Sequence, residues 1–418
     1  METIKIKKSG PLHGSIRVSG AKNAILPILA ATLLTEDECI IHEIPQLEDV
    51  FVMYELLENF GAKIEKIDEN SVKIQTKKIV SCTAPYDLIT KMRASFLVMG
   101  SLLSRTKNAM ISMPGGCAIG SRPIDLHLKG FSSLNVNIKS NNGFIEASTE
   151  ELKGNTIYLD FPSVGATENI MMAACLADGI TILENSAEEP EIVDLANFIN
   201  SMGGKIEGAG TGTIIITGVK KLHATEYTVI PDRIEAGTYM IAALVTGGKL
   251  SIENLNVNHV QSVIAKLKEV GADITEKGNS ITVTSKGQLK ACDIKTLPYP
   301  GFPTDMQAQF MTLLSMSEGV SIINETIFEN RFMHVNELRR LGAKIKIEAN
   351  SAIIDGPITL SGAHVKATDL RAGASLILAG LVSEGETIIS DVYHIKRGYS
   401  NIVEKLKKVG ANIGYFNI

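Results

Sequence analysis

A stretch rich in glycine and proline, residues 113–127, carries one thiol, one guanidinium, one carboxylate and one imidazole. It reads Met-Pro-Gly-Gly-Cys-Ala-Ile-Gly-Ser-Arg-Pro-Ile-Asp-Leu-His, and its three glycines and two prolines predict a loop. Cys117 directly follows a pair of glycines, and Arg122 or His127 could favour its thiolate and make it reactive. A surface turn with an incidental cysteine explains the same residues equally well, so the choice depends on what surrounds the loop.

Positively charged side chains recur at the starts of apolar segments that read as helices. Lys22 and Asn23 precede the first segment, where a lysine opposes the helix dipole but suits a bound anion. An ordinary helix start with an exposed lysine is the alternative. Arginines at comparable helix starts or turns suggest one cleft for a ligand with more than one negative group, because guanidinium groups bind phosphate and carboxylate through paired hydrogen bonds. They are Arg93, Arg331, Arg371 and Arg397.

Two further helix starts carry groups that could take part in chemistry. Asp305 follows the rigid turn Tyr-Pro-Gly-Phe-Pro-Thr at residues 299–304, which would hold a catalytic base in place, although aspartate at a helix start is usually a cap. Residues 162–167, Pro-Ser-Val-Gly-Ala-Thr, could bind phosphate through backbone amides or simply begin a helix. The sequence shows no metal-ligand histidine pair, no nucleotide-binding fingerprint and no serine hydrolase elbow. We therefore expect neither a metal nor a cofactor.

Length and composition narrow the class of protein. A chain of 418 residues favours two domains, and its net charge of −5 gives no support for nucleic-acid binding. The five cysteines lack metal-finger spacing, so free thiols in a reducing cytoplasm are the simplest account. The N-terminus lacks the apolar core of a signal peptide, and no apolar run reaches the roughly 20 residues of a membrane span. We expect a cytoplasmic protein without membrane partners, and a monomer.

A unit of about seventy residues recurs six times along the chain. Each copy has an apolar helix, a short strand, an amphipathic helix and one or two alternating strands. The amphipathic helix ends at a glycine, or in the second copy at Asn135, and these positions are 74, 68, 68, 71 and 68 residues apart. Both residue types suit the left-handed conformation that ends a helix. The glycines are Gly61, Gly203, Gly271, Gly342 and Gly410.

These repeats predict an α/β fold in which the helices are the core. The first helix of each copy is apolar on all sides and must be buried, whereas the alternating strands need a cover on one face only. We expect a two-domain inside-out α/β barrel with buried helices, sheets outside and three repeats per domain. One domain spans residues 22–229 with the Cys117 loop, and the other joins residues 1–21 to 230–418 with Asp305 and Arg397. The N-terminal strands would complete a sheet of the second domain, and the two crossings suggest a hinge.

Eight segments of the chain resemble the enolpyruvyl transferases that act on UDP-N-acetylglucosamine at the start of peptidoglycan synthesis. They are residues 19–24, 117–127, 163–167, 231–235, 303–305, 328–332, 369–373 and 397–399. This family has the two-domain, six-unit fold expected above. The chain departs from it at Phe161, where some members carry a lysine that contacts the nucleotide, and at Asn135, where Leu-Gly-Ala is usual.

The resemblance implies phosphoenolpyruvate and UDP-N-acetylglucosamine as substrates and a role for each site residue. Cys117 would protonate the enolpyruvate methylene and could form an adduct with it, and it would be the target of fosfomycin. Asp305 would take the proton of the sugar 3-hydroxyl, while Lys22, Arg122 and Arg397 would hold phosphoenolpyruvate. The other residues expected to bind substrate are Asn23, Arg93, Pro123, Ile124, Asp125, Leu126, His127, Ser163, Val164, Gly165, Thr304, Ile327, Arg331 and Arg371.

Two alternatives share this fold. The related shikimate-pathway transferase lacks a cysteine acid in its glycine-rich loop and differs around Lys22. A low-activity or regulatory paralogue would keep the fold, although the intact set of Lys22, Cys117, Asp305 and Arg397 argues against it.

Overall fold

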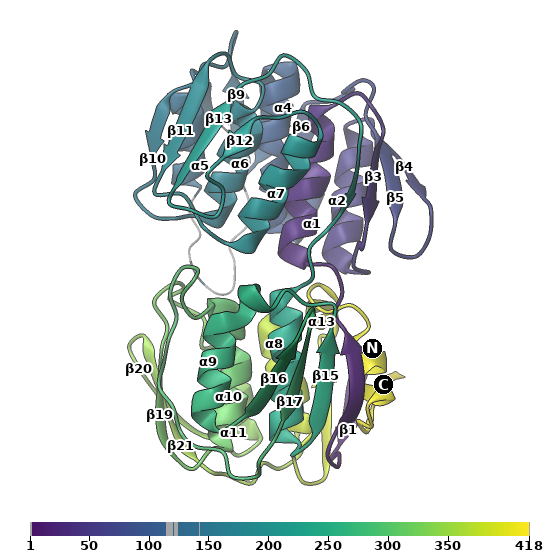
Figure 1. The fold of residues 1–418 in the computed structure, drawn as a ribbon, viewed down its shortest axis with the longest axis vertical. Coiled ribbons are helices and arrows are strands. Elements are labelled where there is room, and N and C mark those ends of the chain that lie inside the picture. The colour runs from purple at the N-terminus through teal and green to yellow at the C-terminus, as the bar shows by residue number, and fades with distance from the viewer. Residues whose placement is uncertain (1, 114–119, 121–123, 142, 418) are drawn as a thin grey trace. The chain divides into compact units, whose positions relative to one another are not determined.

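The computed structural model describes residues 2–113, 120, 124–141 and 143–417 (Figure 1). The chain forms two compact units. One comprises Met1–Ser19 with Pro231–Ile418 and is called the Asp305 unit below; the other takes in most of residues 20–230 and is called the Lys22 unit. The chain thus leaves the Asp305 unit after Ser19 and returns to it at Pro231. The predicted crossings, between residues 21 and 22 and between residues 229 and 230, lie within two residues of these boundaries.

The six apolar helices are buried along nearly their whole length, as predicted. Small residues allow this close packing: a side chain at Gly100 would strike the backbone oxygen of Asn169, so the two helices that carry these residues touch through their backbones. Pro27 lies in the middle of its helix and not in the opening turn, and it removes the N–H that would bond to the Asn23 carbonyl. The helices are α1 (Lys22–Ala31), α4 (Val98–Thr106), α6 (Val164–Ala174), α8 (Arg233–Val245), α10 (Gln307–Ser315) and α12 (Leu370–Gly380).

The amphipathic helices lie closer to solvent and end as predicted. All five of the helix-ending glycines have positive φ angles between 94° and 111°, and Asn135 has φ 69°. One of these helices, α7, departs from the prediction, because it buries most of its residues and not only one face. They are α2 (Glu48–Asn59), α5 (Asp125–Ser133), α7 (Pro190–Ser201), α9 (Gln261–Val270), α11 (Val335–Arg340) and α14 (Ile402–Lys408); α3 (Tyr86–Lys91) and α13 (Tyr393–Lys396) are short additional helices.

Three four-stranded sheets belong to the Lys22 unit. In each, the strand that follows a buried helix pairs in parallel with a strand from an adjacent repeat and antiparallel with its own hairpin. Their orders are β14 (Thr225–Thr228), β3 (Cys39–His42), β5 (Val72–Gln75), β4 (Lys63–Lys66); β6 (Thr83–Ala84), β7 (Asn108–Ser112), β9 (Phe144–Ser148), β8 (Asn137–Asn141); and β10 (Thr156–Tyr158), β11 (Ile180–Glu184), β13 (Thr213–Thr217), β12 (Ile206–Glu207).

The Asp305 unit has three sheets of the same design, two of which use the N-terminal strands. β1 (Glu2–Lys7) pairs with both neighbours in antiparallel fashion and fills the place that a hairpin strand takes elsewhere, and β2 (His13–Arg17) adds a parallel edge. The predicted completion of this unit by the N-terminus is confirmed. The orders are β22 (His364–Lys366), β23 (Glu386–Ser390), β1, β24 (Ile413–Asn417); β16 (Asp273–Lys277), β17 (Ser280–Thr284), β15 (Lys249–Glu253), β2; and β18 (Ile294–Lys295), β19 (Gly319–Asn324), β21 (Ser351–Gly356), β20 (Lys344–Glu348).

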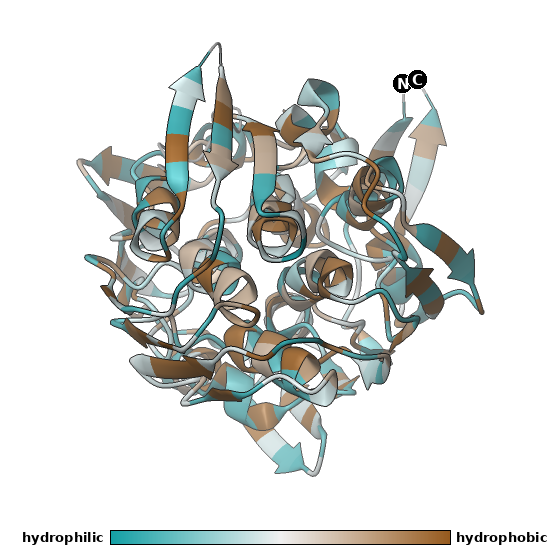
Figure 2. Ribbon diagram, turned by 90° about the horizontal axis from the view of Figure 1, so that it is seen from above, coloured by the Kyte–Doolittle hydropathy of each residue, from teal (hydrophilic) through white to brown (hydrophobic). Residues whose placement is uncertain are grey.

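Each unit has its own hydrophobic core, built from the inward faces of the sheets and the helices they enclose. Figure 2 shows helices seen along their axes at the centre, with strands around them. The inside-out α/β architecture predicted from the repeats is confirmed. Among the described residues, no helix is long and apolar enough to cross a membrane.

Candidate active site

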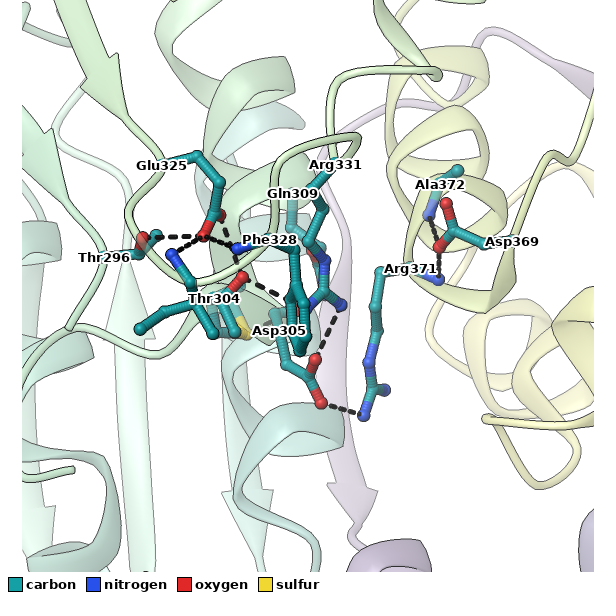
Figure 3. Close-up of polar contacts among 12 residues, drawn as sticks. Thr296, Thr304, Asp305, Gln309, Glu325, Phe328, Arg331, Asp369, Arg371 and Ala372 are labelled. Atoms are coloured by element: carbon teal, nitrogen blue, oxygen red, sulfur yellow. Dashed lines mark hydrogen bonds and ion pairs between the residues drawn. The ribbon is translucent and has the colours of Figure 1, made fainter. Parts of the chain in front are cut away.

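Asp305 lies in a single 3-10 turn, Thr304–Met306, that leads into the buried helix α10. It caps neither element: Pro303 is the N-cap of the turn and Met306 that of α10, and neither makes a capping hydrogen bond through a side chain. The Asp305 carboxylate instead accepts a hydrogen bond of 2.6 Å from Arg331 and one of 2.8 Å from Arg371 (Figure 3). The alternative of an ordinary helix cap is therefore wrong, and the carboxylate is held between two cations.

The two arginines are more deeply buried than the carboxylate between them. The exposed side-chain fractions are 5% for Arg331, 2% for Arg371 and 25% for Asp305. Arg371 is placed by the start of α12, where the Asp369 carboxylate accepts hydrogen bonds from the backbone N–H groups of Arg371 and Ala372. The carboxylate is therefore the part of this cluster that is most accessible to solvent.

The charges in this cluster set the protonation state of Asp305. Burial by itself would raise the pKa of the Asp305 carboxyl, but Arg371 and Arg331 outweigh it and hold the pKa well below its usual range. Burial lowers the pKa of the neighbouring His334 to about 4, so this imidazole is neutral near pH 7 and adds no charge to the cluster. Asp305 is an anion at any physiological pH.

Arg371 keeps hydrogen-bonding capacity that the cluster does not use. Its Nη2 binds Asp305, whereas its Nε and Nη1 meet no acceptor with hydrogen-bond geometry within the described part of the chain, although the Tyr399 hydroxyl lies near enough to act on the charge of this guanidinium. The guanidinium also lies 5.4 Å from the centre of the Tyr399 ring. Buried donors without partners are costly, so these two nitrogens have capacity for an anionic acceptor, which could reach them only if the guanidinium moved, because both are inaccessible to solvent in this structure.

A second carboxylate, Glu325, follows β19 and binds the residue before Asp305. The Thr304 hydroxyl donates a hydrogen bond of 2.8 Å to Glu325 and accepts one of 3.0 Å from Arg331 (Figure 3). Glu325 also accepts hydrogen bonds from the backbone N–H groups of Ile327 and Phe328. Glu325 could not be predicted from the sequence, because an isolated glutamate after a strand carries no signal that distinguishes it from a solvated one.

In the Lys22 unit, Lys22 opens α1 and forms an ion pair of 2.9 Å with Asp49. Asp49 is almost fully buried and Lys22 is 9% exposed, so the alternative of an exposed lysine is wrong. Asn23 follows it and is half-buried. Asp49 lies in the first turn of α2, and its sequence pattern is that of a helix start, which is why sequence reasoning did not single it out.

His127 is packed inside the Lys22 unit. Its Nδ1 lies 3.1 Å from the Asn169 amide nitrogen, and its ring meets Phe96 edge to face at 5.2 Å. A side chain at Gly165 would come within 3.2 Å of the imidazole, so this glycine leaves room for the ring. Ser163 accepts a hydrogen bond from Ala166 N and caps α6, which is the simpler of its two predicted roles.

The remaining predicted residues are placed as follows. Ile124 is buried before α5, Asp125 is exposed in the first turn of that helix, and Leu126 packs against the core. Arg93 opens a 3-10 turn, Val164 begins α6 and Arg397 is half-buried after α13. The predictions for Cys117, Arg122 and Pro123 lie outside the described residues. No group of three or more metal-ligating side chains occurs within the described residues.

Comparison with known proteins identifies the class of protein that this fold and site define. Residues 6–406 match the family model described as EPSP synthase (3-phosphoshikimate 1-carboxyvinyltransferase). Solved structures agree with the fold: the enolpyruvyl transferase NikO from Streptomyces tendae has a TM-score of 0.90 at 24% identity and covers 100% of this chain and 99% of its own. EPSP synthase from Acinetobacter baumannii has a TM-score of 0.79 at 18% identity over the full length of both chains.

Closer relatives define the branch. UDP-N-acetylglucosamine 1-carboxyvinyltransferase 1 of Caldanaerobacter subterraneus is 61% identical, over 98% of each chain. UDP-N-acetylglucosamine 1-carboxyvinyltransferase 2 of Carboxydothermus hydrogenoformans is 58% identical over 99% of each chain, and the Finegoldia magna relative is 54% identical over 99% of this chain and 98% of its own. The chain belongs to the enolpyruvyl (carboxyvinyl) transferase family, within its UDP-N-acetylglucosamine 1-carboxyvinyltransferase branch.

Proposed function

We propose that this protein transfers the enolpyruvyl group of phosphoenolpyruvate to the 3-hydroxyl of UDP-N-acetylglucosamine and releases phosphate. The names of relatives that are 54–61% identical over nearly the whole chain support this acceptor. The observation that carries the chemistry is the Asp305 carboxylate held between Arg331 and Arg371, with two guanidinium nitrogens of Arg371 unused within the described residues. The reaction would supply peptidoglycan synthesis and cell-wall formation.

The reaction needs an acid and a base on different partners. The sugar oxygen attacks C2 of phosphoenolpyruvate while a proton is added at C3; loss of a C3 proton and of phosphate then restores the double bond. We assign Asp305 as the base that takes the hydroxyl proton and Cys117 as the acid at C3. Lys22, Arg122 and Arg397 are the proposed partners of the phosphate and carboxylate groups, because the tetrahedral intermediate keeps both anions.

Arg331 and Arg371 lower the basicity of Asp305 and so determine under which conditions it can accept a proton. A carboxylate whose pKa is held well below its usual range is a weak base. An anionic substrate group that turned Arg371 out of its buried position and bound its Nε and Nη1 would compete with Asp305 for this guanidinium and weaken its hold on the carboxylate. The partly buried carboxylate would then become more basic. Substrate binding and activation of the base are thereby coupled in this proposal.

The cysteines support the role of Cys117 and the expected location. Burial raises the pKa of the Cys39 thiol to about 11, that of Cys175 to about 12 and that of Cys292 to about 11. These three thiols are therefore poor acids and nucleophiles near pH 7. Together with Cys82 they are free thiols, which a reducing compartment preserves, so we propose a cytoplasmic location. A monomer remains our expectation.

Phosphate release measured with two acceptors tests the proposal. Purified protein and phosphoenolpyruvate are mixed with UDP-N-acetylglucosamine in one reaction and with shikimate 3-phosphate in another. Turnover with the UDP-sugar only is the expected result; turnover with shikimate 3-phosphate would favour the shikimate-pathway activity, and turnover with neither would favour a regulatory paralogue. Cys117→Ala should remove turnover near neutral pH while the circular dichroism spectrum stays unchanged, and full activity of this variant would exclude the acid role.

A further inference from the structure

Glu325 is a buried carboxylate that accepts hydrogen bonds from four different groups. It is 3% exposed and directly follows β19. Its Oε1 accepts from the Thr296 hydroxyl at 2.9 Å, from Ile327 N at 2.8 Å and from Phe328 N at 3.2 Å, and its Oε2 accepts from the Thr304 hydroxyl at 2.8 Å. An ionised carboxylate accepts at every position and donates at none, so it satisfies all four groups at once.

The bond to Thr304 determines how that hydroxyl meets Arg331. A hydroxyl has one hydrogen, and Thr304 gives it to Glu325. The lone pairs of its oxygen are then free to accept the 3.0 Å hydrogen bond from Arg331 Nη1, while Arg331 Nη2 binds Asp305. The hydrogen bonds therefore run from Arg331 through Thr304 to Glu325 on one side and from Arg331 to Asp305 on the other (Figure 3).

Glu325 is also linked to Arg331 through Phe328. The guanidinium of Arg331 lies 5.3 Å from the centre of the Phe328 ring. The backbone N–H of Phe328 is one of the four groups that Glu325 binds, as is that of Ile327. One carboxylate thus binds both the Thr304 hydroxyl and the backbone of Phe328, and the hydroxyl and the Phe328 ring contact the same guanidinium.

We propose that Glu325 is a positioning residue for catalysis: it orients Thr304 and the turn at Ile327 and Phe328, and through them fixes Arg331 against Asp305. This inference rests on the proposed function, in which Asp305 is the base. A merely structural role, in which Glu325 only stabilises the turn after β19, is the alternative to be tested.

The substitution Glu325→Gln keeps the size of the side chain and removes its charge. The amide oxygen is held by the three donors that meet at Oε1, so the amide nitrogen faces Thr304 and cannot accept its hydrogen. The hydroxyl must then turn, which disturbs the bond from Arg331. Glu337→Gln is the matched control, because Glu337 is also a largely buried glutamate of the same unit that accepts a backbone hydrogen bond, from Lys366, and it does not contact the cluster. We expect Glu325→Gln to lower kcat by about 10- to 100-fold, as small misplacements of catalytic groups do, while Glu337→Gln leaves it unchanged.

Two further measurements distinguish positioning from stability. In a Thr304→Val background, Glu325→Gln should cost much less in kcat than in the wild type, because both changes break the same hydrogen bonds through Thr304; equal costs in both backgrounds would refute the proposal. Titration of the Asp305 carboxyl by NMR does not depend on turnover, so it reports on the positioning even if the acceptor were wrong. Loss of the hold on Arg331 should move this titration to higher pH in Glu325→Gln.

The direction of that movement is decisive. Removal of a negative charge alone would make Asp305 easier to ionise and move its titration to lower pH. A shift to lower pH, or no shift, together with unchanged kcat and a lower melting temperature, would leave Glu325 a structural residue and overturn the inference. If the wild type fails with UDP-N-acetylglucosamine but the NMR shift to higher pH occurs, the proposed function falls and the positioning by Glu325 stands.

Discussion

Replacement of Asp305 by asparagine tests the physical basis of the candidate site. The change leaves Arg331 and Arg371, which are 5% and 2% exposed, without their counter-charge. Asparagine can accept a hydrogen bond from one arginine, but its NH2 group then faces donors of the other. Breaking a buried ion pair costs about 3–5 kcal/mol. Because Asp305 is 25% exposed and water can approach it, we expect the lower end of this range, about 3 kcal/mol.

The assay is urea unfolding of the whole chain followed by circular dichroism at pH 7. Asp391→Asn is the control: Asp391 pairs with Lys366 in the same unit, but their side chains are 36% and 64% exposed, so the loss should stay below about 1 kcal/mol. A loss for Asp305→Asn as small as that of the control would show that solvent already screens the cluster, and the argument from burial would be refuted.

The dependence on pH gives an independent check of the same reasoning. The pKa of Asp305 is depressed in the folded protein, so its contribution to stability is fully present above its unfolded value of about 3.9. The contribution is lost as pH falls through the lower folded value. The difference between wild type and Asp305→Asn should therefore be constant from pH 5 to 8 and shrink only in strong acid. A difference that declines already between pH 7 and 5 would contradict the low pKa.

Three other predictions follow from the site. Fosfomycin should alkylate Cys117 before the other thiols, as read by peptide mass spectrometry; prior modification of a buried thiol would contradict both the site and the raised pKa values. Lys22→Met should raise KM for phosphoenolpyruvate and lower stability by about 3–5 kcal/mol, since it removes a buried ion pair with Asp49. Lys129→Met, at an exposed pair, should change neither. The pH profile of kcat/KM reports ionisations of the free enzyme, and that of kcat reports those of the enzyme–substrate complex. The loss of activity in acid that comes from protonation of Asp305 should therefore be absent from kcat/KM above about pH 4 and occur at higher pH in kcat. Identical acid limbs in the two profiles would exclude substrate-coupled activation.

Local patterns in the sequence were enough to predict the architecture. The spacing of Asn135 and the helix-ending glycines defines the repeat, and an apolar helix without a polar face has no stable place except inside. The same reasoning predicted that the N-terminal strands complete the last sheet, because the sixth repeat lacks a hairpin strand and β1 supplies it. The repeat and the buried helices depend on residues close together in the chain, whereas the pairing of β1 with β23 and β24 joins its two ends and was predicted from the missing strand of the sixth repeat.

The chemical environment of the site residues was decided by tertiary structure. The sequence singled out Asp305, Arg331, Arg371 and Lys22, but left open whether Asp305 was a cap and Lys22 an exposed side chain. Their partners lie far away in sequence: Arg371 is 66 residues from Asp305. Glu325 escaped notice altogether, because a carboxylate is a solvated charge or a buried acceptor of four hydrogen bonds depending only on which donors the folded chain brings to it. Types and spacing in the sequence determine the fold and the list of candidates, whereas burial and long-range pairing determine protonation and therefore chemistry.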